Sequence, residues 1–350
     1  MKRILVTGGA GFIGSALVRH LVAGGACSVL NCDSLAYAGR LENLESIAGA
    51  ENYRFARLDI RDREGLREAF AGFRPDAVVH LAAQTHVDRS IDSPLDFVDT
   101  NLAGTATLLE SVRDYWGKLP PCEAEGFRYL QVSTDEVFGT LGEAGSFAED
   151  SPYVPRSPYA ASKAGADHLA RAWGTTYGLP VLVSYCCNNY GPFQFPEKLI
   201  PSMAVRILSG AGALPIYGSG RQVREWIHVD DHIRALLAIL EFGTPGETYA
   251  VGSGEERSNL ELVESVCAIL DELCPSAKGR YAERIVHVED RPGHDCRYAL
   301  RTEKLRTATH WYPRIPLKDG LRQTLLWYIN HPHWWQPLVA EACARRGSGL

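Results

Sequence analysis

The 350-residue sequence has no surplus of positive charge, because 36 Lys and Arg residues stand against 42 Asp and Glu residues. Its net charge is −6 at pH 7, whereas a nucleic-acid-binding protein usually carries a basic surface. No apolar run approaches the ~20 residues of a membrane-spanning helix, and the first apolar run is too short for the core of a signal peptide. We therefore expect a soluble, cytoplasmic protein that binds neither nucleic acid nor membranes.

Paired cysteines are also lacking. The nine cysteines are an odd number, they are scattered along the chain, and no C-x-x-C pair occurs among them, which disfavours both a zinc site and a disulfide framework. His86, His228 and His294 likewise show no spacing typical of metal ligands. We expect no bound metal.

Short apolar runs alternate with helical patterns in the first half of the chain. Strands are expected over residues 3–7, 28–33, 53–59, 77–83, 129–134 and 181–187. These runs are apolar almost throughout, as in a parallel sheet that is covered on both faces. Strands and helices in alternation predict an α/β fold with a Rossmann-like, doubly wound parallel sheet.

After residue 190 the chain becomes rich in Gly and Pro, which predicts a second unit built from loops and short elements. Helices are expected there over 231–242 and 259–273. We assign residues 1–189 to a dinucleotide-binding domain, to which 227–254 and about 311–335 return. Residues 190–226 and 255–310 would then form a smaller C-terminal α/β substrate lobe.

A glycine-rich loop follows the first predicted strand and opens a helix: Thr7-Gly-Gly-Ala-Gly-Phe-Ile-Gly14. Gly8 and Gly11 allow the backbone to approach a pyrophosphate, and the free amides at the helix start would bind its charge. Asp33 ends the next strand, where a carboxylate accepts hydrogen bonds from a ribose and repels a 2′-phosphate. The pattern predicts NAD rather than NADP. Glycines that form only a turn are the alternative, which the strand–helix context disfavours.

Tyr159 and Lys163 form a Tyr-x-x-x-Lys pair, which lies on one face of a predicted helix. An ammonium one turn away lowers the pKa of the tyrosine and favours a phenolate that can accept a proton from a hydroxyl. Such a pair alone is usually a solvated helix face. After a dinucleotide fold, and with Ser133 and Thr134 at a strand end upstream, it indicates an alcohol-oxidising site.

Several longer stretches carry a resemblance to a known family. They are residues 7–14 (TGGAGFIG), 86–90 (HVDRS), 133–139 (STDEVFG), 157–163 (SPYAASK), 188–192 (NNYGP), 195–201 (FPEKLIP) and 291–295 (RPGHD). Together they resemble the extended short-chain dehydrogenases/reductases over nearly the whole chain, and more narrowly the dTDP-glucose 4,6-dehydratases. The resemblance implies conversion of dTDP-glucose to dTDP-4-keto-6-deoxyglucose, with internal hydride transfer from C4 to C6 and loss of water.

The pair Asp135-Glu136 separates this reaction from its alternatives. Elimination of water needs a base for the C5 proton and an acid for the leaving oxygen, and adjacent carboxyls in different environments can hold different pKa values. The resemblance implies Glu136 as the base and Asp135 as the acid; related decarboxylases carry Ser at the latter position. A 4-epimerase would have no use for the pair, whose other explanation is a helix cap after a strand. An NAD-binding sensor without catalysis, the second alternative, would not require Tyr159 and Lys163 in register or the downstream phosphate-binding residues.

The resemblance also implies the remaining site residues. The catalytic set is Thr134, Asp135, Glu136, Tyr159 and Lys163. The NAD-binding set is Gly8, Gly11, Phe12, Ile13, Gly14, Asp33, Asp59, Ile60, Leu81, Ala82, Ala83, Thr100, Tyr159, Lys163 and Asn188. The set that binds the nucleotide-sugar substrate is Gln84, His86, Thr134, Asn189, Lys198, Leu199, Pro215, Tyr217, Arg224, Asn259, Arg291, His294 and Tyr298.

Two expectations concern the substrate and the assembly. Many bacterial members of the family carry Glu-Ser where this chain has Gln84-Thr85, and UDP-glucose 4,6-dehydratases resembling plant enzymes carry Gln-Thr. UDP-glucose therefore stays an alternative to dTDP-glucose. The resemblance further implies a homodimer whose interface is made by helices over residues 94–115 and 160–177 of each subunit.

Overall fold

The computed structural model describes the backbone of residues 2–346 and the side chains of residues 2–340. Its main element is a seven-stranded sheet of strand order β10-β6-β5-β4-β1-β2-β3. Every pairing in this sheet is parallel, which confirms the predicted Rossmann-like fold. The strands are β1 (Arg3–Thr7), β2 (Ser28–Asp33), β3 (Tyr53–Arg57), β4 (Ala77–His80), β5 (Arg128–Thr134), β6 (Val181–Cys186) and β10 (Thr248–Val251).

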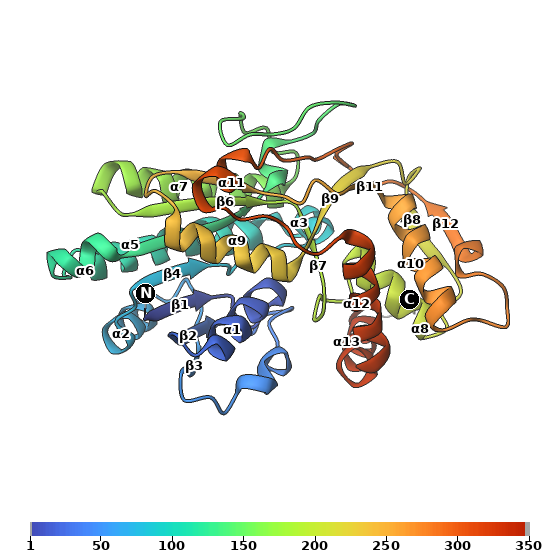
Figure 1. Cartoon of the computed structure of the whole chain (residues 1–350), viewed down its shortest axis with the longest axis horizontal. Helices are drawn as coiled ribbons and strands as arrows, with labels where there is room; N and C mark the ends of the chain where they lie inside the picture. The colour runs from blue at the N-terminus through green and yellow to red at the C-terminus, as the bar shows by residue number, and fades with distance from the viewer. Residues whose placement is uncertain (1, 347–350) are drawn as a thin grey trace.

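Helices cover both faces of the sheet (Figure 1). On one face α2, α5 and α7 pack side by side, and on the other α1, α9 and α11 do so. Their bounds are α1 (Phe12–Gly24), α2 (Arg63–Phe73), α5 (Gly104–Trp116), α7 (Pro158–Tyr177), α9 (Val229–Phe242) and α11 (Glu303–Thr309). Because both faces are covered, the central strands β1, β4 and β6 are buried almost throughout.

The predicted strand and helix boundaries differ from the structure at a few ends. β3 and β4 stop at Arg57 and His80, and the residues after each strand leave the sheet instead of extending it to 59 and 83. The helix expected over 94–115 is α4 (Pro94–Phe97), a wider π-helical segment (Val98–Ala103) and α5 in succession. The chain beyond the strand ends is therefore free to line a cavity.

A second, smaller unit surrounds a separate apolar core. Its sheets have the orders β11-β9-β7 and β12-β8. The strands are β7 (Asn188–Tyr190), β8 (Leu214–Tyr217), β9 (Val223–His228), β11 (Glu256–Ser258) and β12 (Ile285–Val288). The helices are α8 (Leu199–Leu208), α10 (Asn259–Leu273), α12 (Leu317–Asn330) and α13 (Pro332–Arg346). Short helices α3 (Val87–Asp92) and α6 (Pro121–Gly126) lie in the large unit.

The packing of the last third differs from the expected lobe boundaries. Helix α12, in the segment 311–335 expected to return to the large unit, packs against α8 and α10. Leu305 and Trp311, in contrast, belong to the core of the large unit. The apolar stripe of α12 shows that one face is buried, but its periodicity does not say which unit covers it. We refer below to the large unit and the smaller unit as defined by these two cores.

Candidate active site

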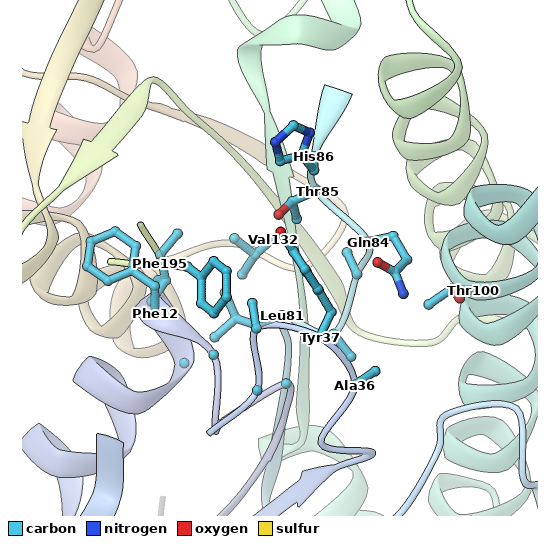
Figure 2. A pocket seen from close by; sticks show the side chains of 18 of the residues that line it. Phe12, Ala36, Tyr37, Leu81, Gln84, Thr85, His86, Thr100, Val132 and Phe195 are labelled. Atoms are coloured by element: carbon cyan, nitrogen blue, oxygen red, sulfur yellow. The ribbon is translucent and has the colours of Figure 1, made fainter. Parts of the chain in front are cut away.

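A cavity of about 330 Å³ opens at the carboxyl ends of the parallel strands, the usual ligand site of an open α/β sheet. Segments after β1, β2, β3, β4, β5 and β6 line it, together with residues 194, 195, 197 and 198. Figure 2 shows Phe12, Leu81 and Val132 of the large unit around the same space as Phe195. All fifteen residues expected to bind NAD line this cavity.

The glycine loop has the close approaches that a dinucleotide site requires. Gly8 has φ +71°, and a Cβ there would lie 2.6 Å from the amide nitrogen of Ala82. A Cβ on Gly14 would lie 2.1 Å from the carbonyl oxygen of Gly8. Helix α1 begins after Gly11 with no side-chain cap, so its first amides are left for a phosphate. The residues present therefore fit NAD.

The side chain of Asp33 faces the cavity and also holds the glycine loop in place. Its carboxylate accepts hydrogen bonds from the amides of Ala10 at 2.9 Å and Leu35 at 2.8 Å. Burial raises the pKa of Asp33, and these two backbone hydrogen bonds oppose that rise. A 2′-phosphate beside this buried carboxylate would be repelled.

Tyr159 and Lys163 lie one turn apart near the start of α7 and both are buried. Ser157 caps this helix, since its hydroxyl accepts a hydrogen bond from Ala160 N at 3.1 Å. Lys163 Nζ donates to the carbonyl of Val132 at 2.8 Å, so its position against β5 is fixed. Burial lowers the pKa of Lys163.

The pKa of Tyr159 is raised well above its ordinary value, first by burial and then by the charge of Glu136. A hydrogen bond with Thr134 acts in the opposite direction. A tyrosine in this setting forms a phenolate only with help from positive charge, and the neighbouring ammonium of Lys163 is placed to give it.

The two adjacent carboxyls lie in different surroundings where β5 ends in a 3₁₀ turn (Asp135–Phe138). Asp135 is 2% exposed and does not line the cavity. Burial, and then Glu136, raise its pKa well above the ordinary range. Glu136 does line the cavity; burial raises its pKa, and the charges of Arg291 and Lys198 oppose the rise.

The expected substrate residues divide into two groups. The cavity is lined by Gln84, His86, Thr134, Asn189 and Lys198. It is not lined by Leu199, Pro215, Tyr217, Arg224, Asn259, Arg291, His294 or Tyr298. All members of this second group lie beyond residue 198, and one of them, Tyr298, belongs to the core of the large unit.

Two of the arginines in the second group have partners within the chain. Arg224 is buried; its guanidinium donates to the carbonyl of Asp295 at 2.9 Å and lies 4.2 Å over the ring of Tyr298. Arg291 is 3.5 Å from Asp88, which also accepts a hydrogen bond from Tyr217 at 3.2 Å. This contact joins the smaller unit to α3 of the large unit.

The structure adds cavity residues that the sequence analysis missed. Tyr37, Phe195 and Glu197 line the same space, and Tyr37 donates a hydrogen bond to Glu197. The ring of Tyr37 packs 5.0 Å from that of Phe195 and 3.8 Å beneath the guanidinium of Arg89. Phe195 and Glu197 could have been found from the sequence, because they lie in the family-like stretch 195–201. Tyr37 could not, because its position depends on a positive φ of 40° that no residue pattern predicts.

No cluster of three His, Cys, Asp or Glu side chains suited to a metal ion occurs among the residues that the structure describes. Within the same part of the chain, no helix is long and apolar enough to cross a membrane.

Comparisons with known proteins identify the family of this chain. The family model of GDP-mannose 4,6 dehydratase matches residues 5–324. A probable dTDP-glucose 4,6-dehydratase of Sinorhizobium fredii is 54% identical over 348 residues, 99% of both chains. The dTDP-glucose 4,6-dehydratase of Neisseria meningitidis is 51% identical over 97% of this chain and 96% of its own.

Among solved structures, the dTDP-glucose 4,6-dehydratase DesIV of Streptomyces venezuelae, with NAD and dTDP bound, superposes with a TM-score of 0.87. It is 45% identical, and the match covers 96% of this chain and 99% of that one. The resemblance expected from the motifs is thereby confirmed. The chain belongs to the 4,6-dehydratase family that this model describes, within the extended short-chain dehydrogenases/reductases.

Proposed function

We propose that this protein is an NAD-dependent hydro-lyase that converts dTDP-glucose to dTDP-4-keto-6-deoxyglucose. The proposal rests on one observation: two sets of reactive side chains lie together at the end of β5. Tyr159 and Lys163 suit the oxidation of an alcohol, and Asp135 and Glu136 suit the elimination of water. Thr134 lies between them, since it hydrogen-bonds Tyr159 and also contacts Asp135 at 3.3 Å.

Tyr159 is proposed to take the proton of the C4 hydroxyl. Lys163 holds a positive charge one turn away, and the hydrogen bond from Thr134 adds to the stabilisation of the phenolate. When bound, NAD supplies the acceptor for the C4 hydride and the means to return it to C6. The fifteen cavity residues named for NAD would hold it, with Asp33 at the ribose and the start of α1 at the pyrophosphate.

Glu136 is proposed as the base for the C5 proton and Asp135 as the acid for the C6 oxygen. Glu136 faces the cavity, and the cationic Arg291 and Lys198 favour its ionised form. Burial and the charge of Glu136 raise the pKa of Asp135 well above its usual range, which favours the protonated form that a general acid needs. One carboxyl is therefore ready to accept a proton and its neighbour to give one.

The substrate diphosphate is proposed to lie between the units. Asn189 and Lys198 reach the cavity, and Arg291 acts on Glu136 from the smaller unit. This local positive charge explains how a chain of net charge −6 binds an anion. The rest of the nucleotide sugar is proposed to contact Gln84, His86, Leu199, Pro215, Tyr217, Arg224, Asn259, His294 and Tyr298.

The test is incubation with dTDP-glucose and, separately, with UDP-glucose, followed by mass spectrometry of the nucleotide sugars. A product lighter by one water and carrying a 4-keto group is expected from dTDP-glucose. If UDP-glucose is turned over and dTDP-glucose is not, the substrate is UDP-glucose. A 4-epimer of unchanged mass would refute the dehydratase.

We further propose that the protein is a cytoplasmic homodimer. Ile91, Leu95 and Val98 expose apolar side chains, Leu95 to 73%, where α3 and α4 pack against α7. Helix α4 lies within the expected interface segment 94–115 and α7 covers the other, 160–177, whereas α3 precedes both. An apolar face of this kind is typical of a subunit contact. All eight cysteines with described side chains are free thiols, as in a reducing compartment.

Light scattering at micromolar concentration checks the dimer. Leu95→Asp should halve the mass, whereas Phe242→Asp, at a side chain 56% exposed on α9, should leave it unchanged. A wild-type monomer would overturn the proposal.

A further inference from the structure

Asn43 lies in the 3₁₀ turn Leu41–Ile47 and is 2% exposed. Its side-chain amide Nδ2 donates to the carbonyl oxygen of Ala10 at 2.9 Å. Its Oδ1 accepts a hydrogen bond from the indole Nε1 of Trp334 at 2.9 Å. One buried amide thus connects the glycine loop of the large unit with helix α13 at the other end of the chain.

Ala10, which Asn43 hydrogen-bonds, is held through both its amide and its carbonyl. The amide of Ala10 donates to Asp33 at 2.9 Å, and its carbonyl accepts from Asn43 and, at 2.9 Å, from the amide of Arg40. Ala10 lies between Gly9 and Gly11, in the part of the loop that must keep its shape for a pyrophosphate to approach. A shift of Asn43 would therefore move the loop itself.

Trp334 in turn is anchored in the core of the smaller unit. Its ring packs 5.0 Å from Trp327 of α12 and 5.8 Å from Phe193. A second contact runs parallel to the first, because Arg19 of α1 donates to the backbone carbonyl of Asn43 and lies 4.2 Å over the ring of Phe193. The two units thus meet at Asn43 through an indole and a guanidinium.

We propose that Trp334 is a positioning residue for the cofactor, whose hydrogen bond to Asn43 holds the glycine loop in the shape that retains NAD. The α13 helix of the smaller unit then controls the residence of a dinucleotide bound mainly by the large unit. Without the indole donor, the buried Oδ1 of Asn43 is left unsatisfied, and the amide gains by rotating away from Ala10. This inference rests on the NAD-binding part of the proposed function and is independent of the elimination chemistry.

The chain offers a matched control in the neighbouring residue. Trp335 is 4% exposed, and its Nε1 donates at 2.8 Å to the carbonyl of Tyr328, within the smaller unit. Trp334→Phe and Trp335→Phe each remove one indole and one buried hydrogen bond from the same helix. Only the first breaks the connection to the glycine loop.

The experiment measures the dissociation rate of NAD from the purified holoenzyme, by dilution into a nucleotide scavenger with chromatographic assay of the remaining NAD. Trp334→Phe should release NAD at least about tenfold faster than wild type, and Trp335→Phe within about twofold of it. Asn43→Asp keeps an acceptor for Trp334 and loses the donor to Ala10, so it should also release NAD faster. Added NAD should restore the turnover of Trp334→Phe, because the groups that do the chemistry are unchanged.

Equal NAD release from the two tryptophan variants, or slow release from Asn43→Asp, would overturn the proposal and leave Trp334 as a packing residue. Thermal unfolding of all three variants shows whether a loss of NAD simply follows a loss of stability, which would also count against it. Failure to dehydrate any nucleotide sugar would refute the proposed function and leave the measured NAD release unaffected, so the two failures are distinguishable.

Discussion

Replacement of the two adjacent carboxyls separates elimination from hydride transfer. In the double variant Asp135→Asn/Glu136→Gln both side chains keep their size and hydrogen-bonding oxygen. Burial and the charge of Glu136 raise the pKa of Asp135 and so favour its neutral form, whose charge and shape Asn reproduces. The contact with Thr134 at 3.3 Å survives through the amide oxygen. The change thus removes an exchangeable proton and a base while the fold is kept.

The expected magnitude follows from the number of groups lost. A positioned acid or base contributes about 10²–10⁴-fold in rate, which corresponds to about 3–5.5 kcal/mol of barrier. Formation of the 4-keto-6-deoxy product should fall by at least that factor. Tyr159 and Lys163 are untouched, so oxidation at C4 should continue and leave a 4-keto-glucose nucleotide.

The assay is stopped-flow absorbance of reduced nicotinamide, combined with mass spectrometry of the quenched nucleotide sugars. The double variant should show a rise in absorbance that does not decay, whereas wild type should show little signal at steady state. Product formation at a rate near wild type would refute the reasoning, because the carboxyls would then be structural and the site would resemble that of an epimerase. Each single variant shows which of the two carboxyls limits the elimination.

The remaining predictions are as follows. Tyr159→Phe should abolish even the first oxidation, so that stopped-flow absorbance shows no reduced nicotinamide. Gly14→Ala should yield protein without co-purifying NAD, since the added Cβ would lie 2.1 Å from a carbonyl oxygen; nucleotide release on denaturation measures this. NADP should compete with NAD at least about 100-fold more weakly in apo protein, measured by titration calorimetry, because the buried Asp33 is proposed to bind the ribose and would repel a 2′-phosphate. His80 is fully buried with its pKa lowered to about 3, so the folded state excludes a proton that the unfolded state binds below pH 6.5. Stability from this residue is present above pH 6.5 and is lost as pH falls toward 3; by linkage it loses about 2 kcal/mol between pH 7 and 5. The stability difference between wild type and His80→Gln in urea unfolding should shrink by that amount.

The cofactor half of the site could be predicted from the sequence because its determinants are local. The glycine loop, the following helix start and Asp33 lie within the 27 residues from Thr7 to Asp33, and each requirement is met by the type of residue at a fixed position. The Tyr159–Lys163 pair is local in the same way, since one helical turn sets its geometry. Five of the eight loop residues, together with Asp33, Tyr159 and Lys163, line one cavity in the structure.

The meeting of the two units could not be predicted in this way. The hydrogen bond between Trp334 and Asn43 joins residues 291 positions apart. No local sequence pattern specifies which distant side chain will hydrogen-bond a buried amide. The same limit explains why α12 was expected in the large unit, since an apolar stripe does not identify the surface that it covers. Tyr37 was missed for a different reason, because its place over the cavity depends on a backbone conformation that few non-glycine residues adopt.

The geometry of the chain after β5 explains how neighbours in sequence obtain opposite chemical roles. In a strand, successive side chains point to opposite faces, and in a 3₁₀ turn of three residues per turn they diverge by about 120°. Because β5 ends at Thr134 and the turn begins at once, the buried Asp135 accepts a hydrogen bond from the cavity residue Thr134, while Glu136 itself lines the cavity. Burial and Glu136 raise the pKa of Asp135 and favour its protonated form, whereas the charges of Arg291 and Lys198 oppose the rise that burial imposes on the pKa of Glu136. Exchanging the two residue types would place the longer side chain in the closed environment and the shorter one at the cavity, so the order Asp-Glu is itself part of the proposed mechanism.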